Sequence, residues 1–325
     1  IRNSMNPITM YFAGAAGRDE SLIELDGRNR LCSFLYPEQL KRWLEYSKQV
    51  EGKVLIDSGA FSAWNRGKIV DFDKYISYCR DALSSPLAKN KIIRCVNLDV
   101  IPGKVGETSN LNKSVKQEDK TIIEEAAKQG YKNLCFFLKQ GIVPIHVFHQ
   151  GEDFKWLDKM VEKTDYIGVS PANDVGMNQK RFWIDRVFSY LEKNSIKVKT
   201  HGFAVWSSSI MLDFPWTSCD AATWQMSAGM GQIHYPVGGF KTPDYSQNPI
   251  IITISENKFK VELYSFGKEV EKMFKEDGYN PEELKKDWKV RTKVNIRYFL
   301  GLEKWLNLKK EKSIFKIRKT LLGEN

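Results

Sequence analysis

Short apolar runs alternate with amphipathic stretches along the first two thirds of the chain. These runs have the length and the β-branched or apolar content of buried strands, and residues with apolar positions at helical spacing follow them. Eight such runs are Ile8–Ala13, Leu31–Tyr36, Val54–Asp57, Ile92–Asp99, Val143–Phe148, Tyr166–Val169, Lys197–Phe203 and Trp216–Cys219. Strands that alternate with helices in this number favour a TIM-type (β/α)8 barrel over a doubly wound sheet.

The pattern changes after the eighth run. Ile250–Ile254 and Phe259–Leu263 flank the polar segment Ser255–Lys258, which is typical of a β-hairpin. Helical spacing then predicts helices over 268–276, 281–300 and 303–322. We therefore expect a barrel over residues 5–232 and an appendage over residues 233–325. The appendage would consist of a hairpin and basic helices packed on the barrel.

The length fits one barrel with an appendage as well as it fits two small domains. The chain has 325 residues, 42% of them hydrophobic, and a formal net charge of +10 that favours an anionic partner such as nucleic acid. Five scattered cysteines without a CxxC pair suggest neither a disulfide framework nor a cysteine zinc site. No apolar run approaches the roughly 20 residues that span a bilayer. A cytoplasmic protein that does not enter the membrane is expected.

Three of the predicted strands lead into an acid, namely Asp57, Asp99 and Asp220. The carboxyl ends of parallel barrel strands share one mouth, so these side chains should lie close together. Two carboxylates at one mouth can divide the work, one attacking carbon while the other moves protons. The alternative is that each Asp caps the helix that follows it, which is less attractive for three acids together.

Basic residues give candidates for nucleic-acid contacts. Arg66 and Lys68 lie in a loop predicted at the mouth side and could hold phosphates. From Gly301 to Leu322 seven Lys or Arg residues stand against two Glu. Lys309, Lys310 and Lys312 in this run are candidates for sequence-independent phosphate contacts, with a solvated helix face as the alternative.

Three histidines raise a metal-site alternative. His146, His149 and His201 resemble the ligand sets of barrel hydrolases. Side chains three residues apart on a strand point to opposite faces, so His146 and His149 would converge only if His149 lies in the following loop. The HxH pair typical of such hydrolases is missing from the sequence.

Five segments, in the order they occur over about residues 9–224, resemble the tRNA-guanine transglycosylases and their relatives. Leu55–Phe61 resembles the family's acid-Ser-Gly-Gly-Phe motif, with Ala60 in place of the second glycine. His149–Gly151 is similar to its Gln-Gly-Gly segment, with Glu152 in place of a glycine. The other three segments are Asn97–Asp99, Tyr166–Ser170 and Ser218–Asp220.

The resemblance implies a role for each of these segments. Asp220 would attack C1′ of the target nucleotide and form a covalent intermediate, while Asp57 would act as general acid and base. Asp99 and Gln150 would read the guanine-like edge, and Gly168 would let backbone amides approach the base. The substrate-binding set that it implies is Ser58, Phe61, Asp99, Gln150, Gly151, Gly168 and Val169. We expect the reaction itself to need no metal and no organic cofactor.

One departure favours DNA over transfer RNA as the substrate. The family's transfer-RNA enzymes usually end in a cysteine-rich zinc site, and no cysteine follows Cys219 in this chain. The phage-type DNA-guanine transglycosylases, which insert 7-deazaguanines such as 7-cyano-7-deazaguanine into DNA, are therefore the nearer resemblance. This implies DNA and a 7-deazaguanine base as partners, and a phage-encoded protein in a host cytoplasm.

Three alternatives remain open on the sequence. The same base exchange could act on tRNA. A metal-dependent barrel hydrolase could act on a small phosphorylated substrate. A third alternative is a non-catalytic nucleic-acid-binding protein that retains the barrel.

Overall fold

The structure is a computed structural model of the 325-residue chain. It describes residues 7–14, 17–46, 51–89, 91–102, 117–172, 175–254 and 267–322. Side chains are described for the same residues except 46, 117–119 and 310–322. Among the described helices, none is both long enough and apolar enough to cross a membrane.

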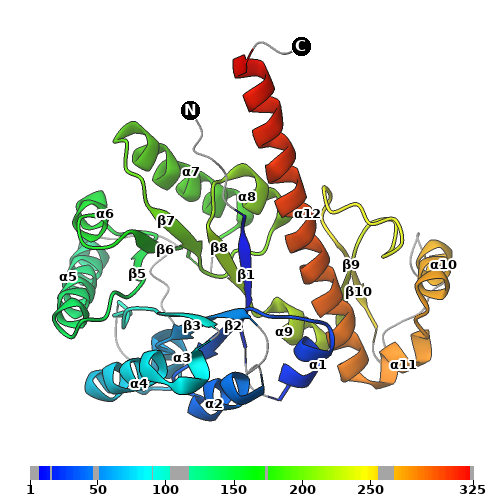
Figure 1. Ribbon diagram of the computed structural model, residues 1–325, viewed down its shortest axis with the longest axis horizontal. Coiled ribbons are helices and arrows are strands. Elements are labelled where there is room, and N and C mark those ends of the chain that lie inside the picture. The colour runs from blue at the N-terminus through cyan, green and yellow to red at the C-terminus, as the bar shows by residue number, and fades with distance from the viewer. Residues whose placement is uncertain are drawn as a thin grey trace. The chain divides into compact units, whose positions relative to one another are not determined.

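Eight parallel strands form one curled sheet, as the sequence pattern predicts (Figure 1). They are β1 (Thr9–Phe12), β2 (Arg30–Ser33), β3 (Gly52–Asp57), β4 (Lys91–Cys95), β5 (His146–His149), β6 (Tyr166–Ser170), β7 (Lys199–Gly202) and β8 (Ser218–Ala221). Their order is β4-β3-β2-β1-β8-β7-β6-β5. The two ends meet through a parallel bridge between Val96 and Ile145, so the sheet closes into a (β/α)8 barrel.

The helices predicted after the strands are present. They are α2 (Pro37–Tyr46), α4 (Phe72–Ser84), α5 (Gln117–Lys139), α6 (Phe154–Val161), α7 (Met177–Lys193) and α8 (Ser208–Asp213). Three short helices that the pattern did not predict are α1 (Asp19–Glu24), α3 (Ala60–Asn65) and α9 (Thr223–Gly229). Helices of fewer than two full turns give few apolar positions, so their periodicity is easily missed, although α8, of similar length, was predicted.

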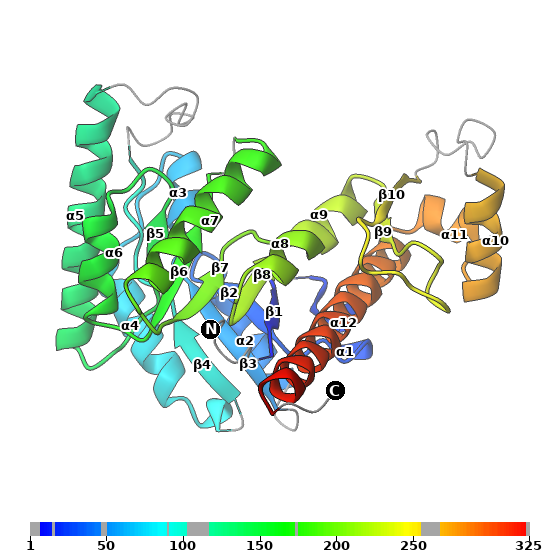
Figure 2. The same ribbon diagram turned by 90° about the horizontal axis from the view of Figure 1, so that it is seen from above.

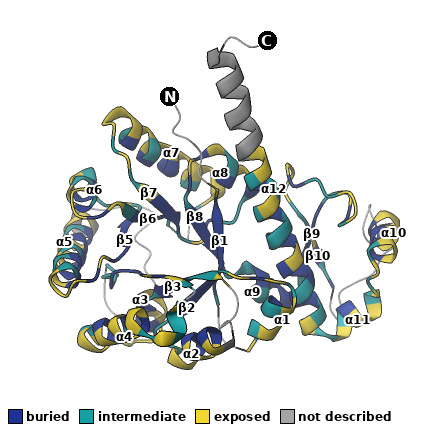
Figure 3. Ribbon diagram, in the orientation of Figure 1, coloured by how far each residue is buried: buried dark blue, intermediate teal, exposed yellow. Residues whose placement is uncertain are grey.

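The chain divides into two compact units. One, here called the barrel unit, comprises residues 29–204 and 216–220. Most residues of its strands are buried, as the dark ribbons of Figure 3 show, and Val54, Leu55 and Ile56 of β3 have no exposed surface. The buried hydroxyl of Tyr75 on α4 lies 2.7 Å from the Val96 carbonyl and 3.2 Å from that of Ile56, which ties this helix to β3 and to the residue after β4.

The other unit, here called the helical unit, comprises residues 1–28, 205–215 and 221–325. Its two-stranded sheet pairs β9 (Gln232–Tyr235) with β10 (Ile250–Thr253) in antiparallel register. Helices α10 (Gly267–Asp277), α11 (Pro281–Lys286) and α12 (Trp288–Leu322) follow, and α12 runs beside α9 and β9 (Figure 2). The predicted strand at Ile250 is confirmed, but its partner is β9, which the sequence pattern did not reveal. Phe259–Leu263 lies outside the described residues.

The prediction of a helix break near Gly301 was wrong. Helix α12 continues through Gly301, and the break falls earlier, at Asp287, whose carboxylate accepts a hydrogen bond from the Lys289 N–H at 2.7 Å. Gly301 is needed for packing instead, because a Cβ at this position would collide with the Tyr245 side chain. A glycine inside a helix can therefore mark a close approach rather than an end.

Candidate active site

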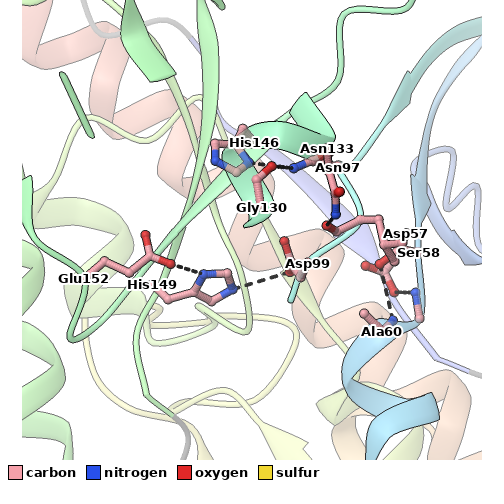
Figure 4. Close-up of polar contacts among 12 residues, drawn as sticks. Asp57, Ser58, Ala60, Asn97, Asp99, Gly130, Asn133, His146, His149 and Glu152 are labelled. Carbon is pink, nitrogen blue, oxygen red and sulfur yellow. Dashed lines mark hydrogen bonds and ion pairs between the residues drawn. The ribbon is translucent and has the colours of Figure 1, made fainter. Parts of the chain in front are cut away.

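Asp57 lies at the carboxyl end of β3, where the chain turns sharply into α3. Gly59 makes this turn with φ = +71°, and a Cβ here would lie 2.6 Å from Leu35 Cγ and 2.7 Å from Ser33 Oγ. The Gly59 N–H donates to Asp57 Oδ2 at 2.9 Å, and Ser58 Oγ accepts from the Ala60 N–H at 3.3 Å (Figure 4). The Ser-Gly turn therefore holds the carboxylate in place.

The surroundings of Asp57 bring its pKa close to neutral pH. Burial, and after it the charges of Asp99 and Asp220, raise the pKa of Asp57 to about 7 against the lowering effect of the Gly59 N–H. Both acids act on Asp57 because the barrel brings the ends of β3 and β8 and the segment after β4 to the same mouth. A carboxyl group that titrates near the working pH is suited to general acid–base catalysis.

Asp99 follows β4 and faces a charged histidine. His149 Nε2 lies 3.4 Å from Asp99 Oδ2, and His149 Nδ1 lies 3.0 Å from Glu152 Oε1 (Figure 4). Burial lowers the pKa of His149, but Asp99 and Glu152 together outweigh it and raise the pKa to about 10. The other oxygen, Asp99 Oδ1, is buried and has no hydrogen-bond partner among the described residues.

Helix α5 fixes the backbone that leads to Asp99. The Asn97 amide donates to the Gly130 carbonyl at 2.9 Å and lies 2.8 Å from His146 Nδ1 (Figure 4). The Asn133 amide donates to the Leu98 carbonyl at 3.0 Å. Burial lowers the pKa of His146 to about 4, so this histidine is a neutral acceptor at Nδ1. His146 thus supports the strand end that carries Asp99.

Gln150 follows β5 with its side-chain amide oriented. Its Oε1 accepts from the Ala172 N–H at 3.0 Å, and its own N–H donates to the Ser170 carbonyl at 3.0 Å. Because the carbonyl end is engaged, the NH2 end of the amide is the end left to donate to a ligand. Gly151 has φ = +109°, a left-handed conformation that favours glycine in the turn after Gln150.

Asp220 lies inside β8 rather than after it, since the strand continues one residue further, to Ala221. Its Oδ1 accepts from the Ala204 N–H at 2.9 Å and lies 3.4 Å from His201 Nε2. His201 Nδ1 in turn lies 2.5 Å from Ser218 Oγ. These contacts orient the Asp220 carboxylate. From the sequence, His201 was a candidate metal ligand only. Its position beside Asp220 could not be predicted, because the register of β7 against β8 cannot be determined from the sequence.

Gly168 makes room for an aromatic ring. It lies within β6 between β5 and β7, and a Cβ at this position would lie 2.5 Å from Phe203 Cε2 and 3.1 Å from Val147 Cγ2. The neighbouring Val169 is fully buried in the strand. Phe61 is exposed on α3, with 47% of its surface accessible, so it remains free to contact a ligand.

The basic candidates are exposed where the structure describes them. In the barrel unit, Arg66 donates to the Tyr36 hydroxyl at 2.8 Å, and Lys68 lies in the turn after α3. In the helical unit, Lys309 is exposed, with Nζ 5.5 Å from the Trp305 ring centroid. The side chains of Lys310 and Lys312 lie outside the described residues.

The histidines of the metal-site alternative belong to separate networks. His146 contacts Asn97, His149 joins Asp99 to Glu152, and His201 joins Ser218 to Asp220. In the described part of the chain, no group of three or more His, Cys, Asp or Glu side chains is arranged to hold a metal ion.

Comparison with known proteins adds no family to this description. No protein-family model matches the sequence, and no curated protein matches it. What the fold and the site define is a (β/α)8 barrel with three interacting acids at its mouth, one of them titrating near neutral pH.

Proposed function

We propose that the protein is a DNA-guanine transglycosylase, which exchanges guanine in DNA for a 7-deazaguanine by double displacement. One observation carries the proposal. Asp57, with a pKa of about 7, lies under the influence of both Asp99 and Asp220, at one barrel mouth. A proton carrier, a base-reading carboxylate and a nucleophile are the three acids that this reaction needs.

In the first displacement, a carboxylate oxygen of Asp220 attacks C1′ of the target nucleotide. The bond between C1′ and N9 of guanine breaks, and its electron pair stays on the base. Asp57 in its protonated form gives this nitrogen a proton, so guanine leaves as a neutral molecule. The Ala204 N–H donates to Oδ1 of Asp220, and His201 Nε2 lies 3.4 Å from the same oxygen, which leaves Oδ2 to form the bond.

In the second displacement, the roles reverse. Asp57, now a carboxylate, removes a proton from N9 of the incoming 7-deazaguanine. That nitrogen attacks C1′, and the bond between C1′ and Asp220 breaks to return the free carboxylate. A carboxyl group with a pKa of about 7 serves both half-reactions, because both protonation states are populated at neutral pH.

Base recognition uses the groups that the protein leaves unengaged. Asp99 Oδ1 is a buried acceptor without a partner among the described residues, and a guanine-like edge offers N–H donors to it. The Gln150 amide has its oxygen bound by Ala172 and can donate to O6. A buried acceptor costs about 1–3 kcal/mol when left unsatisfied, so a bound base would relieve that cost.

DNA is proposed as the polymer for two reasons. The net charge of +10 favours a polyanion, and the chain has no cysteine after Cys219 for the zinc site usual in the transfer-RNA enzymes. The target base must leave the stack before Asp220 can reach C1′, which costs a few kcal/mol in duplex DNA. Single-stranded DNA should therefore react faster than duplex.

The experiment is an uptake assay with radiolabelled guanine and labelled 7-cyano-7-deazaguanine. Wild type, Asp220→Asn and Asp81→Asn are each incubated with guanine-containing DNA, or with tRNA, at neutral pH. Asp81 lies exposed on α4, so Asp81→Asn makes the same chemical change away from the mouth. We expect label in DNA with wild type and Asp81→Asn, and none with Asp220→Asn.

Other outcomes decide against parts of the proposal. Label in tRNA alone would replace the polymer and keep the chemistry. No label in either polymer would overturn the transglycosylase function. Uptake that a strong chelator abolishes would contradict a metal-free reaction.

A further inference from the structure

Glu152, which departs from the transglycosylase-like motif, contacts His149 at the mouth. Glu152 stands where the resembling motif has a glycine, and its Oε1 lies 3.0 Å from His149 Nδ1. The opposite ring nitrogen, Nε2, lies 3.4 Å from Asp99 Oδ2. Figure 4 shows the imidazole between the two carboxylates, with both ring nitrogens engaged.

The arrangement uses one oxygen of Asp99 and leaves the other. An imidazole that meets a carboxylate at each nitrogen carries both protons and cannot rotate without losing a partner. Asp99 Oδ2 is therefore turned toward His149, and Asp99 Oδ1 is buried without a partner among the described residues. Buried carboxylate oxygens are usually hydrogen-bonded, so Asp99 Oδ1 is the atom that is available to a ligand.

The positive ring also changes which ligands suit Asp99. His149 already supplies the cation that a buried carboxylate requires, so a cationic ligand group would compete with an existing partner. A neutral N–H of a heterocycle needs only the free oxygen and meets no such competition. The side chain of Glu152 is only 9% exposed, so water does little to screen its attraction for His149.

We propose that His149 and Glu152 are positioning residues of the base-binding site, which fix Asp99 as a single-oxygen acceptor for an uncharged purine or deazapurine N–H. Glu152 orients His149, His149 holds Oδ2, and Oδ1 faces the ligand. This inference rests on the proposed function, since it assigns to that same site a preference for neutral bases.

The test combines a kinetic measurement with a spectroscopic one on the full chain. The variants are His149→Leu, Glu152→Gln and, as matched control, Glu124→Gln, which removes the charge of an outward-facing Glu124–Lys155 ion pair. We expect His149→Leu to raise KM for guanine about tenfold with a smaller change in kcat, because binding is lost rather than chemistry. Glu152→Gln should give a smaller rise, since its amide oxygen still accepts from His149. The control should match wild type.

The spectroscopic arm uses histidine-labelled protein and free guanine. The chain has four histidines, so the ring signals are few enough to assign by substitution. Guanine should shift the His149 ring signals of wild type and of Glu124→Gln, because the ligand shares the Asp99 carboxylate with this ring. A structural role alone predicts no such shift.

The outcomes separate the inference from the proposed function. Base exchange with an unchanged KM in His149→Leu would overturn the inference and leave the function standing. If wild type exchanges no base, the function falls, and the guanine-induced shift then decides the inference alone. A shift of the His149 signals supports it, and their indifference to guanine overturns it. Circular dichroism checks that His149→Leu is folded. If His149→Leu does not fold, Glu152→Gln supplies the same comparison of KM with wild type.

Discussion

Replacing Asp57 by Asn should stabilise the protein at neutral and alkaline pH while it removes base exchange. Asn keeps the shape of the side chain, and its amide oxygen can still accept from the Gly59 N–H. What it removes is a charge that burial, Asp99 and Asp220 all disfavour. In the proposed reaction, the same unfavourable charge would make Asp57 suitable as a proton carrier.

The magnitude follows from the pKa. Asp57 titrates at about 7 in the folded protein and near 3.9 when unfolded, so between these values the folded state binds more protons and stability falls as pH rises. About three pH units at 1.36 kcal/mol each give about 4 kcal/mol above pH 8. About 2 kcal/mol of this should develop between pH 5 and pH 7. Asp57→Asn should escape this loss.

The assay is urea unfolding of wild type, Asp57→Asn and the exposed control Asp81→Asn. Unfolding is monitored by tryptophan fluorescence at several pH values from about pH 5 to above about pH 8. The difference in unfolding free energy between Asp57→Asn and wild type should grow as pH rises and level off above the folded pKa. Asp81→Asn should show no such growth. A difference between Asp57→Asn and wild type that stays constant with pH would refute the electrostatic reasoning.

Three further predictions concern single sites. Gly301→Ala should cost about 1–3 kcal/mol in urea unfolding because its methyl group meets Tyr245, whereas a gain of stability would show that helix propensity decides. Gly168→Ala should displace the Phe203 ring and lower kcat/KM for base exchange about tenfold or more, and full activity would contradict the close approach. In a nitrogen-15 NMR titration, His149 should stay doubly protonated from about pH 6 to about pH 9, and loss of its charge near its ordinary pKa of about 6.5 would disprove the ion pairs.

Much of the barrel could be predicted from the sequence because its signals are local. An apolar run such as Val54–Ile56 identifies a buried strand, and the acid after it marks the carboxyl end. The order of strands then follows from the alternation with helices, since parallel neighbours need crossover connections. The meeting of Asp57, Asp99 and Asp220 at one mouth is a consequence of that alternation.

The remaining features depend on contacts between segments distant in sequence. Strand β9 pairs with β10, but the sequence of the loop between them does not indicate a hairpin. Gly301 suggests the end of a helix, and only its contact with Tyr245 explains why a glycine is needed there. Contacts between distant segments also could not be predicted at the candidate active site. His149 and Glu152 were visible as residues, but the sequence does not say that both reach toward one another and toward Asp99. Side-chain direction at a strand end is decided by the turn that follows it.

The proposed double displacement requires Asp220 to form a covalent bond to the target nucleotide. The most direct test is to mix the protein with single-stranded guanine-containing DNA in the absence of incoming base, denature it, and map any DNA adduct by mass spectrometry. We predict an adduct on Asp220 in wild type and none in Asp220→Asn. An adduct on another residue, or base exchange that proceeds without any adduct and survives Asp220→Asn, would contradict it.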